Sequence, residues 1–187
     1  MFKQKVNNFV PQFISIFLII WGAASFFVFP SLEFVQYLFL AFSIFAIIFA
    51  LQKKLRYFTF IITCFSNVYG LYGLLFTYGL PVWIIMIGLA VILGFLYHQL
   101  SKDHVDENFL IYLSLFIVLC LEIFLTLSYY LVNPMTRSLI IVIFSHLYFG
   151  FVGSLSHDSI DSKNIYSYLY LSLFLLILVF LTVTWGH

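Results

Sequence analysis

The chain is built almost entirely from apolar runs of about 20 residues, the length that a helix needs to cross the hydrocarbon core of a bilayer. Composition agrees, because 64% of the residues are hydrophobic and only 8% are charged, which leaves little polar surface to meet water. The runs cover residues 10–29, 31–51, 57–79, 81–99, 109–131, 138–156 and 165–185. The sequence therefore predicts an all-α, polytopic membrane protein in which residues 1–187 form a single membrane domain, a seven-transmembrane-helix bundle.

The segments between the runs are short and polar, as turns between neighbouring helices are. Outer turns are expected at Pro30, at Gly79–Pro81 and at Asn133–Arg137, and inner loops at Gln52–Arg56, Ser101–Asn108 and His157–Asn164. The sequence indicates no linker, soluble domain or internal repeat.

The basic residues fix the expected orientation. Seven of the eight fall on one side when the runs are threaded in order, namely Lys3, Lys5, Lys53, Lys54, Arg56, Lys102 and Lys163. Arg137 alone lies on the other side. The positive-inside rule then predicts an N-terminus inside and a C-terminus outside.

No sequence motif for catalysis, nucleotide binding or metal binding is present, and no basic stripe suggests nucleic acid. Ser154 and His157 superficially resemble the pair of a membrane serine protease, but no second helix supplies a base for them. Cys64 and Cys120 lie in apolar runs without CxxC spacing, as inert buried thiols do. We expect no catalytic residue and no metal site in this chain.

Three polar residues lie deep inside the expected spans: Asn67, Glu122 and His146. At 1.5 Å per residue, Asn67 is about 15 Å and Glu122 about 21 Å from the inner ends of their spans, and His146 reaches a similar level. One hypothesis is a proton relay or ion site in a shared polar layer. The other is a hydrogen-bonded clamp between helices, with Glu122 protonated, and it is favoured because so few groups cannot connect both faces.

Small residues predict where helices approach closely. Gly70 and Gly73 lie one turn apart in the third span, and Gly150 and Gly153 do so in the sixth. Small residues at this spacing let neighbouring backbones come near each other in a membrane.

A series of short motifs follows from the third span to the end of the chain. In order they are Leu55-Arg56-Tyr57, Phe65-Ser66-Asn67-Val68, Tyr97-His98-Gln99-Leu100, Ser128-Tyr129-Tyr130 before Pro134, Ser145-His146-Leu147 before Gly153-Ser154, and Thr184-Trp185-Gly186. Together they resemble subunit III of the haem–copper cytochrome c oxidases. The family has Leu-Arg-Tyr, Ile-Ser-Glu-Val, His-His-Ser-Leu, Glu-Tyr-Tyr-Glu-Ala-Pro, Phe-His-Gly-Leu-His and Trp-Trp-Gly at these places.

The chain departs from the family pattern at several places. Asn67 stands where the family has an intramembrane Glu, and Phe149 replaces the second His of the sixth span. Glu122 aligns with no family carboxylate; that it substitutes for the missing one is a hypothesis. The connection from the third to the fourth span is short. The resemblance thus implies a divergent, shortened member.

The resemblance implies a non-catalytic subunit of cytochrome c oxidase, an enzyme only through its partners. It would pack against subunits I and II and accessory subunits, hold phospholipid in a cleft between its first two helices and the other five, and support proton uptake. Haem a and copper would belong to the partner subunits. Arg56 and His146 are candidate lipid-binding residues, although Arg56 also suits an ordinary topology-setting charge.

The resemblance also implies a place in the mitochondrial inner membrane, with the N-terminus in the matrix and the C-terminus in the intermembrane space. The 25 Phe residues agree with an AT-rich organellar coding sequence. Two alternatives stay open. One is a small transporter or channel that uses Glu122 and His146, although the first, second and seventh spans have almost no polar face for it. The other is a membrane subunit of another respiratory complex, such as NADH dehydrogenase.

Overall fold

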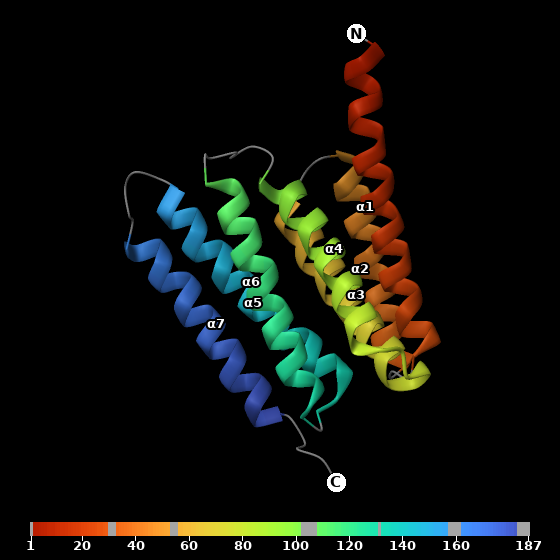
Figure 1. Ribbon diagram of the computed structural model, residues 1–187, viewed down its shortest axis with the longest axis vertical. Helices are drawn as coiled ribbons and strands as arrows, with labels where there is room; N and C mark the ends of the chain where they lie inside the picture. Colours follow the sequence, from red (N-terminus) through yellow and green to blue (C-terminus); the bar gives the residue numbers. More distant parts are fainter. Residues whose placement is uncertain are drawn as a thin grey trace. The chain divides into compact units, whose positions relative to one another are not determined.

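The structure, a computed structural model, describes residues 2–29, 33–52, 56–101, 108–130, 132–156 and 162–182 (Figure 1). Their long elements are all α-helices: α1 (Phe2–Val28), α2 (Glu33–Gln52), α3 (Arg56–Tyr78), α4 (Val82–Leu100), α5 (Phe109–Ser128), α6 (Pro134–Ser156) and α7 (Ser162–Thr182). Six of them, α1 to α6, are long and apolar enough to cross a membrane, and the apolar stretch described in α7 is shorter, Tyr168–Ile177. The chain is a helical, multi-pass membrane protein.

The first helix is longer than the sequence predicts. It begins at Phe2 rather than at residue 10 and contains Pro11, whereas its apolar, span-like part is Val10–Val28. The apolar run marks only the part of a helix that lipid surrounds. Lys and Gln, which are good helix formers, allow the helix to continue beyond that part.

The turn between α5 and α6 also differs from the expectation. The helix α5 ends at Ser128 rather than at residue 131, and α6 begins at Pro134 rather than at residue 138. Asn133 caps α6, because its side-chain oxygen accepts a hydrogen bond from the Met135 N–H at 3.0 Å. Proline suits the first helical position, since its ring fixes a helical φ and its missing N–H is not needed there. Of the expected outer turn Asn133–Arg137, only Asn133 therefore lies before the helix.

The other turns agree with the sequence where the structure describes them. Gly79–Pro81 separates α3 from α4, and Gly79 takes a left-handed φ of 64° that favours glycine. The helix α7 begins at Ser162, three residues before the expected start. Pro30, and the inner loops at residues 53–55, 102–107 and 157–161, lie outside the described residues, as does the expected end of the seventh span.

The chain divides into two compact units, Met1–Asp103 with α1 to α4 and His104–His187 with α5 to α7. That residues 1–187 form a single bundle stays a prediction.

The first unit is organised around α3, which packs against α1, α2 and α4 (Figure 1). Stacked aromatic rings join the first three helices. The ring of Phe26 on α1 stacks on Phe39 of α2 with centroids 4.4 Å apart, and on Tyr69 of α3 with centroids 4.3 Å apart. Such parallel contacts add to the packing of apolar side chains, which is the main attraction between helices in lipid.

The second unit is organised around α6, which packs against α5 and α7. Ile140 and Ile143 of α6 form a buried cluster with Val179 of α7. At the start of α6, Arg137 is only 4% exposed, and its guanidinium donates a hydrogen bond to the backbone oxygen of Tyr130. The one basic residue expected outside thus fixes the turn between α5 and α6.

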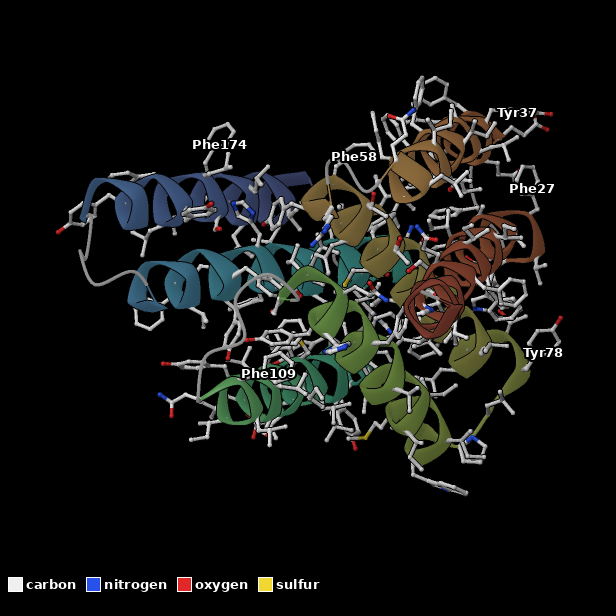
Figure 2. All side chains as sticks on the ribbon, turned by 90° about the horizontal axis from the view of Figure 1, so that it is seen from above. Phe27, Tyr37, Phe58, Tyr78, Phe109 and Phe174 are labelled. Atoms are coloured by element: carbon white, nitrogen blue, oxygen red, sulfur yellow. The ribbon has the colours of Figure 1, made fainter. Side chains whose placement is uncertain are left out.

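Large apolar side chains also cover the outside of both units, as a lipid-facing surface requires. Tyr37 on α2 and Phe174 on α7 point away from their helices in Figure 2, and their exposed fractions are 66% and 62%.

Candidate functional site

The polar side chains inside the first unit gather where α1 meets α3. We define the α1–α3 seam as Leu18, Gly22 and Ser25 of α1, Phe29 directly after α1, and Ser66, Asn67, Gly70 and Gly73 of α3. Within each helix these residues recur at intervals of one, three or four positions, so they share one side of the helix.

Glycines let the two helices meet closely in the α1–α3 seam. A Cβ on Gly22 would lie 2.8 Å from the Cβ of Ser66, and one on Gly70 would lie 3.0 Å from the Cβ of Ser25. A Cβ on Gly73 would overlap the ring of Phe29. The close approach predicted for Gly70 and Gly73 is confirmed.

Gly22 was not predicted as a contact position. The signal was present, because Gly22-Ala23-Ala24-Ser25 is a run of small residues inside the first apolar stretch. Such a run is typical of an interface between membrane helices.

Asn67 is the hydrogen-bonding centre of the seam and is 0% exposed. Its Nδ2 donates to the backbone oxygen of Leu18 on α1 at 3.0 Å and to that of Thr63 on its own helix at 2.7 Å. The hydroxyl of Ser25 adds a second bond between the helices, to the backbone oxygen of Ser66 at 3.2 Å. At Asn67 the structure therefore shows the hydrogen-bonded clamp between helices.

Both hydrogen bonds of Asn67 need an N–H donor, which its amide group supplies. Both partners of the Asn67 Nδ2 are carbonyl oxygens, which repel a carboxylate oxygen placed at the same distance. An amide also does not ionise, so Asn67 cannot carry a proton as a carboxylate could. The Asn67 Oδ1 has no hydrogen-bond partner among the described residues.

Glu122 is in the second unit, on α5, and it points outward. Among the described residues it makes no hydrogen bond and no ion pair. The expected polar layer would unite Asn67 of the first unit with Glu122 and His146 of the second, and it stays a prediction.

His146 lies at the contact of α6 with α7. It is half-buried, and its ring centroid is 5.1 Å from that of Tyr168 on α7. One turn along α6, a Cβ on Gly150 would overlap the Tyr168 ring, so the two helices approach closely here, as the sequence predicts for Gly150. Gly153 lies in the last turns of α6, and its close approach to a neighbouring helix stays a prediction.

The cysteines of the two units are both buried and free. The Sγ of Cys120 on α5 lies 3.8 Å from the Oγ of Ser145 on α6, a weak contact between the two helices. This placement fits a packing role.

The remaining candidates lie at helix ends. Arg56 is the half-buried first residue of α3, and Ser154 is in the last turn of α6. His157, the second member of the pair with Ser154, lies outside the described residues. Lipid binding at Arg56 and His146 stays a prediction.

Within the described part of the chain, no three His, Cys, Asp or Glu residues group together to hold a metal ion. The chemistry available in the α1–α3 seam is hydrogen bonding between helices rather than bond making or breaking. The chain matches no protein-family model, no curated protein and no solved structure. The resemblance to subunit III of the cytochrome c oxidases thus rests on the sequence motifs.

Proposed function

We propose that this chain is a non-catalytic membrane subunit of a mitochondrial cytochrome c oxidase, similar to subunit III of that family. Its role is to pack beside the catalytic subunits, which hold haem a and copper. The proposed topology has seven spans in the inner membrane, with the N-terminus in the matrix and the C-terminus in the intermembrane space.

The non-catalytic role is supported by the hydrogen bonds of Asn67. The buried amide donates to backbone oxygens of α1 and α3, so it holds two helices together. The motifs from Leu55 to Gly186 support the choice of complex.

The close contact in the α1–α3 seam argues against a transporter path along it. The position next to Gly22 is occupied by Ser66, and the position next to Gly73 by Phe29. A path for ions or protons needs a chain of polar groups or water, and side chains fill this contact.

The same contact refines the lipid-binding part of the proposal. The resemblance implies a lipid cleft between the first two helices and the rest, but α1 and α3 touch directly along the seam. We therefore place a bound phospholipid at the inner end of α3, where the Arg56 guanidinium suits a phosphate group. The family's intramembrane Glu is absent at Asn67, so support of proton uptake would not pass through this position.

Gentle-detergent purification through a tag on this chain tests the assignment, with a visible redox difference spectrum of the purified particle. We expect a haem a band near one equivalent per chain. A colourless particle that contains this chain alone would contradict the proposal. Flavin and iron–sulfur signals without haem a would support the NADH dehydrogenase alternative instead. An unrelated inner-membrane protein with the same tag is the control.

The proposed topology has its own test at the two ends of α5. Tyr129 and Asn108 are both exposed and lie just beyond opposite ends of that helix. In a chain whose two cysteines are replaced by serine, a membrane-impermeant thiol reagent added to mitoplasts should label Tyr129→Cys and spare Asn108→Cys. The reverse pattern would overturn the orientation.

A further inference from the structure

Glu122 lies on a continuous outward-facing stripe of α5. Ile111, Leu115 and Val118 precede it at intervals of three or four residues, and their exposed fractions are 58%, 54% and 52%. Residues at this spacing lie on one face of a helix, so the carboxylate stands at the end of a row of exposed aliphatic side chains. We call these four residues the Glu122 face.

The opposite stripe of α5 is the one that the chain itself buries. Phe116, Cys120 and Phe124 are each 0% exposed and recur at intervals of four residues. Phe116 packs on Tyr148 of α6, with ring centroids 5.2 Å apart. The Glu122 face is therefore turned away from the helix that α5 packs against.

The depth of Glu122 makes its exposure costly. It follows Phe109, the first residue of α5, by 13 positions and precedes Ser128, the last, by six. These separations correspond to about 20 Å and about 9 Å along the helix axis, which places the carboxylate within the hydrocarbon core. Ionisable groups at that depth normally face a partner rather than lipid.

On the expected topology, no basic residue of the first unit lies at the depth of Glu122. In the first unit, Lys3 and Lys5 precede the apolar part of α1, Arg56 is the first residue of α3, and Lys53, Lys54 and Lys102 lie in the inner loops. The expected topology puts all of them at the inner side of the membrane, where it also puts the start of α5. The carboxylate is about 20 Å farther along its helix.

In the described part of the second unit, no basic side chain forms an ion pair with Glu122. His146 lies on α6 against Tyr168 of α7, and the Glu122 face is turned away from α6. Lys163 is the second residue of α7, again at the inner side. Arg137 is 4% exposed, and its guanidinium donates to the backbone oxygen of Tyr130, whereas Glu122 points outward. On the expected topology, a cation at the depth of Glu122 then comes from another molecule.

We propose that the Glu122 face of α5 binds a transmembrane helix of a different protein subunit, and that a Lys or Arg in this helix pairs with Glu122. Opposite charges in contact reduce the cost of holding either one in hydrocarbon, and the aliphatic part of the face packs against the partner helix. The basic residue of the partner lies about 9 Å below the outer end of α5. The inference holds whether or not the partner belongs to an oxidase.

Photo-crosslinking in native membranes tests the partner. A photoreactive amino acid at Val118, one turn from Glu122, should give an adduct whose cross-linked peptide is an apolar span with a Lys or Arg inside it. We expect Glu122→Gln to lower the adduct at least tenfold and Glu122→Asp to retain most of it. Thr126→Val, one turn beyond Glu122 on the same exposed side, is the matched control and should leave the adduct unchanged.

Each other outcome overturns the proposal. Adducts with lipid alone would show that no protein helix covers the Glu122 face. Adducts with this chain, from the same copy or a second copy, would show that the chain covers its own face. A partner peptide without a basic residue, or an adduct unaffected by Glu122→Gln, would exclude the ion pair.

Infrared spectroscopy tests the charge state independently of any cross-link. The difference spectrum between the native complex and its Glu122→Gln variant should lack the carbonyl stretch of a protonated carboxyl, because the proposed pair needs an ionised Glu122. A protonated-carboxyl band that disappears in the variant would overturn the ion pair. Circular dichroism of the variant checks that its helix content is unchanged, as expected for an exposed side chain.

Discussion

The helices α3 and α5 have similar sequence patterns, but the first is largely buried and the second is largely exposed. Each is a long apolar helix with one strongly polar residue inside its apolar part, Asn67 in α3 and Glu122 in α5. Every side chain of α3 from Ile62 to Gly73 is buried, and Asn67 bonds to a neighbouring helix. In α5 only Phe116, Cys120 and Phe124 are buried, and Glu122 points outward. A polar residue in a membrane helix can therefore join helices of its own chain or be available to bind another molecule. The packing around it decides which of the two occurs.

Small residues explain how the two helices diverge. Ser66, Gly70 and Gly73 give α3 a surface that α1 can approach closely, so the polar groups of the two helices come within hydrogen-bonding distance. The helix α5 has neither glycine nor alanine. Its bulky side chains keep neighbours at a larger distance, and one polar side chain then has no backbone within reach.

The largest effect should follow replacement of the amide at the centre of the seam. Asn67→Asp places a carboxylate against the backbone oxygens of Leu18 and Thr63, and we expect the free energy of unfolding to fall by about 3 kcal/mol. Asn67→Leu, which only removes the hydrogen bonds, should cost about 1 kcal/mol. Denaturant titration in mixed micelles measures both. Equal stability of the Asp variant and the native chain would show that Asn67 is not a donor to α1.

A slightly smaller effect is expected from filling the close contact. Gly22→Ala puts a methyl group where Ser66 lies, so α1 must move away from α3, at a cost of about 2 kcal/mol. Gly88→Ala is the matched control. Its new Cβ would lie 3.7 Å from Leu71, an ordinary contact, and alanine favours helix, so stability should be unchanged or slightly higher. The same titration applies, and equal losses in both variants would refute the close approach at Gly22.

Phe26 and Phe27 are adjacent in α1, but their replacement should change the free energy of unfolding by different amounts. Phe26→Leu removes parallel contacts to Phe39 and Tyr69, and should lower the free energy of unfolding by about 1 kcal/mol. Phe27→Leu, at a side chain that is 48% exposed, should change it by less. Thermal unfolding of the two variants in one detergent compares them directly. A larger loss for Phe27→Leu would mean that the α1–α2 contact is rotated from the described one.

The smallest effect is expected at Glu122 in the isolated chain. Since Glu122 bonds to no described residue, Glu122→Gln should alter the free energy of unfolding by less than about 0.5 kcal/mol. Unfolding of the purified single chain measures this, apart from any partner. A loss comparable to that of Asn67→Leu would instead place the partner of Glu122 within this chain, and would erase the contrast between α3 and α5.

Much of the candidate site could be located from the sequence, but its chemistry could not. Asn67, Gly70 and Gly73 stand out in the sequence, and the structure places all three in the α1–α3 seam. The sequence is compatible with both a proton relay and a clamp at Asn67, because it does not show which backbone oxygens an amide can reach. Gly22 by itself does not stand out in the sequence, since its importance depends on the opposing position of Ser66.

The helical segments of the described residues, and the turn at Gly79–Pro81, could be predicted from the sequence alone. Run lengths of apolar residues and polar turn residues placed most helix ends within a few positions, and the larger errors were at the start of α1 and around the cap at Asn133. The buried side of each helix, in contrast, became visible in the packing of the helices against one another. In water, alternating polar and apolar residues mark that side, but in lipid both sides are apolar and the pattern disappears. The buried side of a membrane helix is then selected by close packing alone. For that reason, only the packed structure shows that Asn67 faces inward and Glu122 faces outward.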